Sequence, residues 1–398
     1  MVTNLTMQTN SARGFAILLL ARYLTEMLIE EGRLGRESAL DAFLRFEQAG
    51  AYARHVGHGV GSDIRGIDRV RSKVAEGSGK VPIGANPDGF ILIDQKVNGL
   101  WGLFSVSARI SGLISDGPVG VTPDAKAFVE SAYLPRLQRV LDELLYLVER
   151  GGQLDTATPD AAFAALKDVL SESFTAEEQA FYGAYLRDGI HVRHDSELLR
   201  DRQKRLCEML VDNADPDAAI GREDMVRLCE AARSVDDGLA NRLDRIVRLE
   251  AVLAPAMSLL DFVLTCHGRE LGDVAEELTD RWGRSVPYID AARNADLLAE
   301  VRSASSEGVG GCFSKCQRAL DGGNYVDALD ALLAWHEDVM RRRGGAAWVL
   351  IAEDKTLDVR YRGAEQALPS GDELSALWRN GYFIAPLKSI IGQLDRAA

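Results

Sequence analysis

Apolar residues recur at helical spacing through most of this 398-residue chain. Two such segments, residues 12–31 and 37–53, are joined by a short glycine-containing turn, which predicts a pair of antiparallel helices. The same period returns in three later segments, residues 137–148, 239–253 and 325–343. The pattern therefore predicts a mainly α-helical protein whose middle is an array or bundle of antiparallel helices.

Proline-containing motifs mark the expected starts of three helices. Thr122-Pro-Asp, Thr158-Pro-Asp and Asp215-Pro-Asp each place a capping side chain before a proline and an acid in the first turn. Pro255 directly follows the apolar pattern of residues 239–253, and we expect it to kink or end that helix.

Residues 88–106 interrupt the helical pattern. Four consecutive apolar residues at 90–93 are followed by Gly99 and Gly102. Inside a helix each glycine costs about 1 kcal/mol relative to alanine, so these two indicate a special backbone geometry or the close approach of another segment. We expect an extended block here.

Near the C-terminus the period changes from that of a helix to that of a strand. Residues 347–352 are mostly apolar, and residues 357–362 alternate apolar with charged side chains, which predicts a β-hairpin over residues 346–362. Because an isolated hairpin is only marginally stable in water, we expect it to form one small sheet with the 88–106 block.

These elements suggest three segments. Residues 1–121 would hold the helical pair, a basic loop and the extended block, and residues 122–343 would form an acidic helical domain. Residues 344–398 would contribute the hairpin and two short helices that pack back on the N-terminal region.

Charge and composition limit the classes of protein to which this chain could belong. No stretch approaches the roughly 20 uncharged apolar residues that span a bilayer, so we expect no membrane contact. The net charge of −14 resides in the middle of the chain and opposes a general affinity for nucleic acid. Five cysteines, an odd number, favour free thiols in a reducing cytoplasm.

A basic stretch near the N-terminus is the strongest candidate binding segment. It carries four arginines and one lysine between several glycines and histidines: Arg54, Arg65, Arg69, Arg71 and Lys73. Arginines and exposed backbone amides bind phosphate groups, so the stretch could contact nucleic acid locally. The alternative is a solvated connector whose arginines pair with the acidic middle of the chain.

An enzymatic alternative rests on Asp88, Asp94 and Lys96. A Pro-Asp followed by Asp-x-Lys resembles the pattern of nucleases in which two acids hold a divalent metal and a lysine helps to activate water. The two acids are only six positions apart, which is short for neighbouring strands. The alternative is a solvated strand edge beside a turn.

His191 and His194 form a second possible metal site. Two imidazoles three residues apart share one face if the segment is helical, and such a pair can bind zinc or iron. No further histidine or cysteine ligand lies nearby in the sequence, so an exposed polar helix end is the alternative.

Several short pieces resemble a group of uncharacterised bacterial proteins that are often encoded beside phage-defence and restriction genes. The pieces lie at residues 12–23, 46–47, 64–67, 99–104 and 347–350. The resemblance implies an accessory or sensing component of a multigene system that acts around DNA. It implies no active site.

Because no coherent catalytic set emerges, the leading expectation is a non-catalytic interaction protein without a cofactor. It would bind other protein subunits and contact nucleic acid through the basic loop. The alternatives are a divalent-metal-dependent nuclease and a metal-binding regulator.

Overall fold

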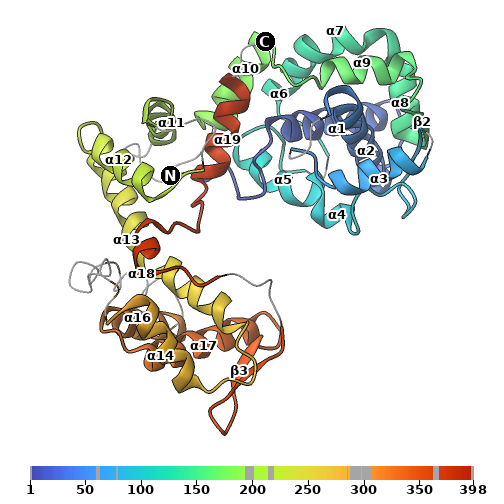
Figure 1. The fold of residues 1–398 in the computed structure, drawn as a ribbon. Helices are drawn as coiled ribbons and strands as arrows, with labels where there is room; N and C mark the ends of the chain where they lie inside the picture. Colours follow the sequence, from blue (N-terminus) through green and yellow to red (C-terminus); the bar gives the residue numbers. More distant parts are fainter. Residues whose placement is uncertain are drawn as a thin grey trace. The chain divides into compact units, whose positions relative to one another are not determined.

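The computed structural model describes residues 2–59, 63–77, 79–117, 119–192, 201–213, 219–284, 286, 297, 307–361 and 367–395. The chain is mainly α-helical, as the periodicity predicts, with two small two-stranded sheets among these residues (Figure 1). It divides into unit 1, Met1–Ala219 with Gly381–Ala398, and unit 2, Ile220–Asn380.

A pair of helices, α1 (Ala12–Glu30) and α2 (Ala39–His58), forms the centre of unit 1. Nearly every side chain of α1 from Ala12 to Thr25 is buried, which is typical of a helix enclosed on all sides. Figure 1 shows α5 (Leu100–Ile110), α8 (Leu141–Arg150) and α9 (Ala161–Val169) around this pair. The predicted helical pair is confirmed.

Shorter elements complete unit 1. Its remaining helices are α3 (Ile67–Glu76), α4 (Gln95–Asn98), α6 (Pro123–Phe128), α7 (Leu134–Leu137), α10 (Ala176–Tyr182), α11 (Arg202–Asn213) and α19 (Ile384–Asp395). Single turns of other helix types are η1 (Arg36–Ser38), η2 (Val129–Tyr133), η3 (Gln138–Val140) and η4 (Gly183–Arg187).

Two of the three predicted helix starts fall on described residues. Thr122 caps α6 through its side chain, which accepts a hydrogen bond from the N–H of Ala125, with proline in the first turn. At the second start, Asp160 and not Thr158 is the cap, because its carboxylate accepts the N–H of Phe163 at 2.7 Å. The third, at Asp215, lies outside the described residues.

The prediction of an extended block at residues 88–106 is wrong, because no residue in this range forms a strand. Asp94 instead caps α4, and α5 buries Leu100, Phe104 and Ala108 on one face at a spacing of four residues. Burial of this apolar face stabilises the helix by more than the glycine in it costs.

The two glycines of this block are explained by close approach, as the sequence indicates. A Cβ at Gly99 would approach the carboxylate of Glu47 to 2.6 Å. A Cβ at Gly102 would approach the backbone oxygen of Lys96 to 2.7 Å. Both positions therefore require glycine.

A sheet that the sequence did not reveal links β1 (Lys80–Ile83) to β2 (Gly152–Asp155). The strands are antiparallel, with Val81 opposite Leu154 and Pro82 opposite Gln153. Both strands are only four residues long, and glycines precede β2, so neither shows a clear alternating pattern.

Unit 2 has its own hydrophobic core. Its elements are α12 (Arg222–Arg233), α13 (Asp237–Val263), α14 (Leu271–Trp282), α16 (Glu307–Asp321), α17 (Tyr325–Arg342), α18 (Gly371–Ala376), β3 (Val349–Ile351) and β4 (Leu357–Val359). Helix α13 continues through Pro255, so the expectation that this proline ends the helix is wrong.

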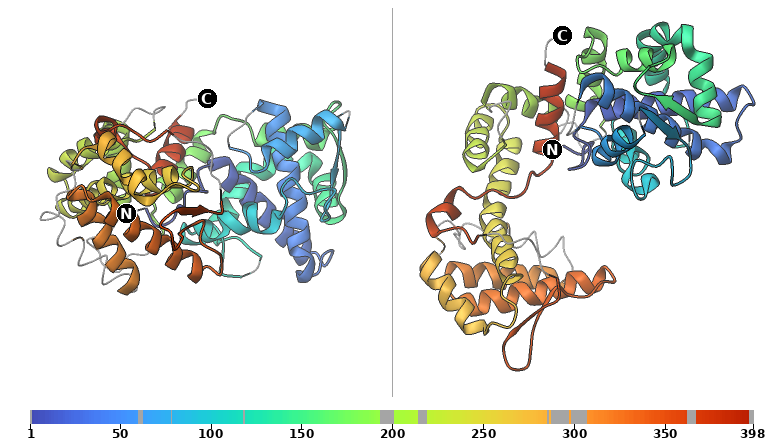
Figure 2. Two further views of the ribbon diagram at one scale, coloured as in Figure 1. Left: turned by 60° about the horizontal axis from the view of Figure 1, so that its bottom comes forward. Right: turned by 45° about the vertical axis from the view of Figure 1, so that its right-hand side comes forward.

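The C-terminal hairpin is confirmed, but its expected partner is not. Strand β3 pairs with β4, Val349 opposite Val359, and Figure 2 shows the hairpin as a narrow loop extending from the helices of unit 2. Among the described residues the one isolated bridge that involves the hairpin joins Thr356 to Glu270, so the hairpin does not pair with the 88–106 block. The buried side chains of Leu357 and Val359 pack into the helical core instead of a larger sheet.

These two units divide the chain differently from the three expected segments. The boundary at Ala219 falls inside the expected 122–343 domain, and the hairpin belongs to unit 2. The last helix does pack on the N-terminal region, since Gln393 accepts the N–H of Ala12 at 2.8 Å and donates to the carbonyl of Asn10 at 2.7 Å.

Candidate functional site

The basic stretch does not form one exposed site, because Arg54 lies in the interior. Its guanidinium bonds the carboxylate of Asp63 at 2.6 Å and the carbonyl of Leu170 at 3.0 Å, and the residue is 2% exposed. A guanidinium engaged in this way is not available to an external phosphate. Arg54 therefore acts within the fold, contrary to its predicted phosphate-binding role.

The other predicted cations lie on or beside α3. Arg65 is half-buried and donates to the carbonyl of Asn98 at 3.1 Å. Lys73 donates to the carbonyl of Asp88. Arg69 and Arg71 are exposed, so these two alone of the predicted set remain fully accessible.

A small polar cavity brings Arg54 and Arg65 together with Arg13, Glu47 and Asp63. Its volume is about 20 Å³. A water molecule needs roughly 10–15 Å³, so the cavity has room for one water molecule but is too small for a phosphate group. Burial raises the pKa of Glu47 to about 7, although the N–H of Leu100 and the amide of Gln95 oppose this by stabilising the charge. The cavity belongs to the packing of unit 1.

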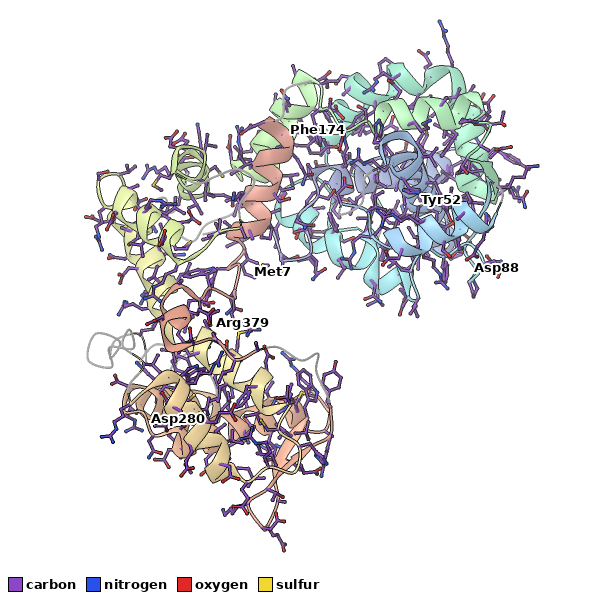
Figure 3. The ribbon with its side chains drawn as sticks, in the orientation of Figure 1. Met7, Tyr52, Asp88, Phe174, Asp280 and Arg379 are labelled. Atoms are coloured by element: carbon purple, nitrogen blue, oxygen red, sulfur yellow. The ribbon has the colours of Figure 1, made fainter. Side chains whose placement is uncertain are left out.

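The candidate nuclease residues do not occupy neighbouring strands. Figure 3 labels Asp88 at the edge of unit 1, where it lies in a turn. Asp94 is the cap of α4, and Lys96 lies on the same short helix with its side chain exposed. The three residues therefore lack the two-stranded support that the nuclease pattern uses.

Only one of the two candidate metal-binding histidines is described. His191 stacks on Tyr185 with 4.6 Å between ring centroids, and its Nε2 lies 3.9 Å from the carboxylate of Asp124. His194 lies outside the described residues. Among the residues that the structure describes, no group of three or more histidine, cysteine or acidic side chains is placed to hold a metal ion.

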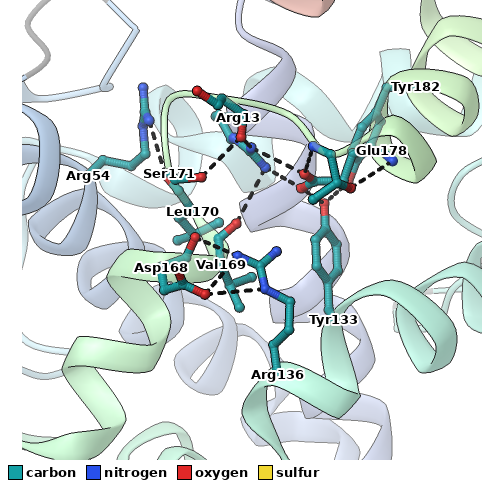
Figure 4. Close-up of polar contacts among 12 residues, drawn as sticks. Arg13, Arg54, Tyr133, Arg136, Asp168, Val169, Leu170, Ser171, Glu178 and Tyr182 are labelled. Carbon is teal, nitrogen blue, oxygen red and sulfur yellow. Dashed lines mark hydrogen bonds and ion pairs between the residues drawn. The ribbon is translucent and has the colours of Figure 1, made fainter. Parts of the chain in front are cut away.

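A buried ion pair organises one end of unit 1 (Figure 4). Arg13 and Glu178 are both almost fully buried and bond each other, and Tyr133 donates to Glu178 at 2.9 Å. Tyr182 lies 3.0 Å from the hydroxyl of Tyr133. Burial, with Tyr182 and Glu178 nearby, raises the pKa of Tyr133, so it stays a neutral donor.

Three arginines donate to carbonyls at the C-terminal end of α9 and in the turn that follows it. A helix leaves its last carbonyls without partners inside the helix. Arg13 donates to Ser173 at 2.7 Å, Arg54 to Leu170 at 3.0 Å, and Arg136 to Asp168 at 2.7 Å (Figure 4). Positive charge is favourable there because of the helix dipole. The burial of Arg13 and Arg54 thus has a structural explanation.

The main cavity of functional interest is a groove of about 450 Å³ in unit 1. This volume lies within the usual range for ligand sites. Its walls come from α2, α8, β2 and α9, with these lining residues: Ala49, Asp142, Glu143, Leu144, Tyr146, Leu147, Gly151, Gly152, Gln153, Leu154, Asp160, Ala162, Phe163 and Leu166.

The groove has an apolar floor and an acidic rim. Leu144, Phe163 and Leu166 are buried beneath it. Exposed acids stand on its walls, Asp142 and Glu143 at the start of α8 and Asp160 at the start of α9. Among the residues that the structure describes, no lysine or arginine lines the groove. The helix dipole favours acids at helix N-termini, and the three carboxylates give the groove its acidic rim.

One wall of the groove is the open edge of β2. The backbone N–H of Thr156 donates to the carbonyl of Gly79 at 2.5 Å. In an antiparallel pair the backbone groups of successive residues point alternately toward and away from the partner strand. The N–H and C=O groups of Leu154 and Gly152 therefore point toward β1. The backbone N–H and C=O of Gln153 therefore point away from β1, toward the side on which the described part of the chain places no further strand of this sheet. Such an edge can accept another strand.

Sequence reasoning missed this groove. Its residues come from four separate elements, and their acids look like ordinary first-turn charges. The signals that could have indicated it are the paired glycines at 151–152, which mark a break after α8, and Tyr146, an aromatic that remains 63% exposed.

No protein-family model, curated protein or solved structure matches this chain. Among the described residues, no helix has the length and apolar character needed to cross a membrane.

Proposed function

We propose that this chain is a non-catalytic interaction protein whose groove binds an extended, basic segment of a partner protein. The observation that carries the proposal is the meeting of an apolar floor, an acidic rim and an open strand edge in one groove. If the bacterial resemblance described above holds, the partner would be another subunit of a phage-defence-type system.

Each of the three features would bind a different part of the partner segment. A partner strand beside β2 would exchange backbone hydrogen bonds with Gln153, each contributing about 0.5–1.5 kcal/mol. Alternate side chains of that strand would point toward the floor formed by Phe163 and Leu166 and toward solvent. Lysines or arginines on the segment would lie against Asp142 and Glu143.

An acidic rim favours a basic occupant over a nucleic acid. The phosphates of a nucleic acid would approach Asp142, Glu143 and Asp160 with like charge, and no basic side chain lines the groove to offset the repulsion. The cytoplasmic location expected from the free cysteines would suit such a subunit.

Isothermal titration with synthetic octapeptides tests the proposal. A peptide that alternates valine and lysine should bind the full chain, and its affinity should fall as salt is raised. The same peptide with glutamate in place of lysine should bind at least tenfold more weakly.

Matched variants locate the site. Asp142→Asn with Glu143→Gln should weaken the lysine peptide and reduce its salt dependence. Asp116→Asn changes a side chain that is 98% exposed on a separate loop and should leave binding unchanged. Equal binding of the lysine and glutamate peptides, or no effect of the double variant, would overturn the proposal.

A further inference from the structure

Three aromatic rings stand in a row on unit 2. Trp348, just before β3, has its ring centroid 5.1 Å from that of His336 on α17 and 5.1 Å from that of Tyr361, just after β4. The planes are tilted by 55° and 35° respectively. The three residues come from separate elements, so the fold itself assembles the row.

Backbone contacts hold the central ring in place. The N–H of Trp348 donates to Nε2 of His336 at 2.9 Å, and its carbonyl accepts the N–H of Arg360 at 2.7 Å. Burial lowers the pKa of His336, which keeps the imidazole neutral and able to accept this bond at neutral pH. The position of Trp348 is therefore set before any ligand arrives.

The row is exposed despite its apolar surface. Trp348 is 37% exposed and Tyr361 is 55% exposed, whereas Trp282 in the same unit is 4% exposed. Large exposed aromatics that are held rigidly are typical of binding surfaces.

Arginines occur on the elements that carry these rings. Arg341 and Arg342 end α17 and Arg343 is its C-cap, up to about 10 Å along the helix from His336 at 1.5 Å per residue. Arg360 is exposed beside Tyr361 and pairs with the exposed carboxylate of Asp358 at 3.1 Å, a surface ion pair of the kind that contributes little in water. Asp338 pairs with Arg341 and Arg342, but Arg343 forms no ion pair with the described residues.

We infer that this aromatic row and its arginines form a binding site for single-stranded nucleic acid. One base stacks on Tyr361, the next packs against the exposed part of Trp348, and the phosphates contact Arg343 and Arg360. Stacking on aromatic faces is tolerant of sequence, because every base offers a π-face. The site lies on unit 2, whereas the proposed peptide groove lies on unit 1, so neither inference rests on the other.

A flexible single strand fits this surface better than a duplex. In a duplex the bases are already stacked on one another and cannot reach the rings, and the net charge of −14 repels a long array of phosphates. Contact with only two phosphates gives a shallow salt dependence. At about 0.7 per phosphate, the logarithm of the affinity should fall with the logarithm of the salt concentration with a slope near −1.4.

Fluorescence anisotropy of a labelled ten-nucleotide thymidine strand with the full chain tests the inference. We expect the strand to bind and a duplex of equal length to bind more weakly. Tyr361→Ala and Trp348→Ala should each weaken binding roughly 5- to 150-fold, the range for loss of one stacked base. Because Trp348 also packs on its neighbours, the thermal melting of each variant is measured alongside. If the Trp348→Ala variant is unfolded, the result with Tyr361→Ala tests the inference.

Two charge variants separate stacking from general electrostatic attraction. Arg343→Gln should lower the salt slope by about 0.7, and Arg233→Gln, an exposed arginine at the end of α12, should leave it unchanged. Failure of the strand to bind, or unchanged affinity of a folded Tyr361→Ala variant, would overturn the inference. So would equal loss from the two arginine variants.

Discussion

The carboxylate of Glu47 on α2 accepts a hydrogen bond from the backbone N–H of Leu100 at 2.6 Å, at the first turn of α5. Glu47 also accepts the amide of Gln95 at 2.8 Å. A fully buried side chain thus holds the start of one helix against the middle of another. This contact explains why Gly99, next to Leu100, has no room for a Cβ.

Glu47 should make the stability of unit 1 depend on pH. Burial raises its pKa from 4.5 to about 7, so the folded state binds a proton that the unfolded state releases. Its contribution is therefore fully present below pH 4.5 and is lost as the pH rises toward 7 and above.

Glu47→Gln isolates this effect, because glutamine does not ionise and still offers an oxygen to Leu100. The unfolding free energy of the wild type relative to the variant should fall by on the order of 3 kcal/mol between pH 4.5 and 7, measured by urea denaturation. A difference that stays constant over this range would show that Glu47 titrates normally.

The buried pair of Arg13 and Glu178 should matter far more than a surface pair. Arg13→Met leaves Glu178 charged and buried, so we expect a loss of about 3–5 kcal/mol in the free energy of unfolding. Arg33→Met breaks a pair with Glu149 at the surface and should cost less than about 1 kcal/mol. Similar losses in the two variants would contradict the structural role of the buried pair.

Glycine substitutions test the close approach at the start of α5. Gly99→Ala should destabilise unit 1, because its Cβ meets the Glu47 carboxylate and the backbone. Gly392→Ala, inside α19 with no heavy atom within 4 Å of the new Cβ, should stabilise it by about 0.5–1 kcal/mol. Thermal melting of both variants checks this prediction: the melting temperature should fall for Gly99→Ala and rise for Gly392→Ala.

Periodicity predicted α17 well, because its apolar residues fall at a clear helical spacing. The pair α1 and α2 was predicted from two apolar segments joined by a short glycine-containing turn. The 88–106 block shows where such reasoning stops. A Cβ at Gly102 would meet the backbone of Lys96 and Val97, close by in the sequence. At Gly99 one approaching group, the Glu47 carboxylate, is about 50 residues away in the sequence and leaves no local signal.

The candidate sites were harder to predict, because each depends on contacts between distant segments. Arg54 looks like a free cation in the sequence, yet it is buried against Asp63 and the end of α9. The open edge of β2 is invisible until Gly152–Asp155 is paired with Lys80–Ile83. Charge composition indicated acidity but not that three acids line one groove.

The open edge of β2 can be altered without disturbing its sheet. The N–H of Gln153 points away from β1, and Pro82 already occupies the position opposite it. Gln153→Pro should therefore leave the melting temperature nearly unchanged and weaken the valine–lysine peptide about tenfold, as measured by titration. Retained affinity would mean that the peptide does not add as a strand.

Amide hydrogen exchange of the full chain, with and without the valine–lysine peptide, tests the central claim most directly. The account predicts that the N–H of Gln153 becomes protected when the peptide binds, while the N–H of Leu154, which faces β1, changes little. Binding that leaves Gln153 unprotected would contradict strand addition at this groove.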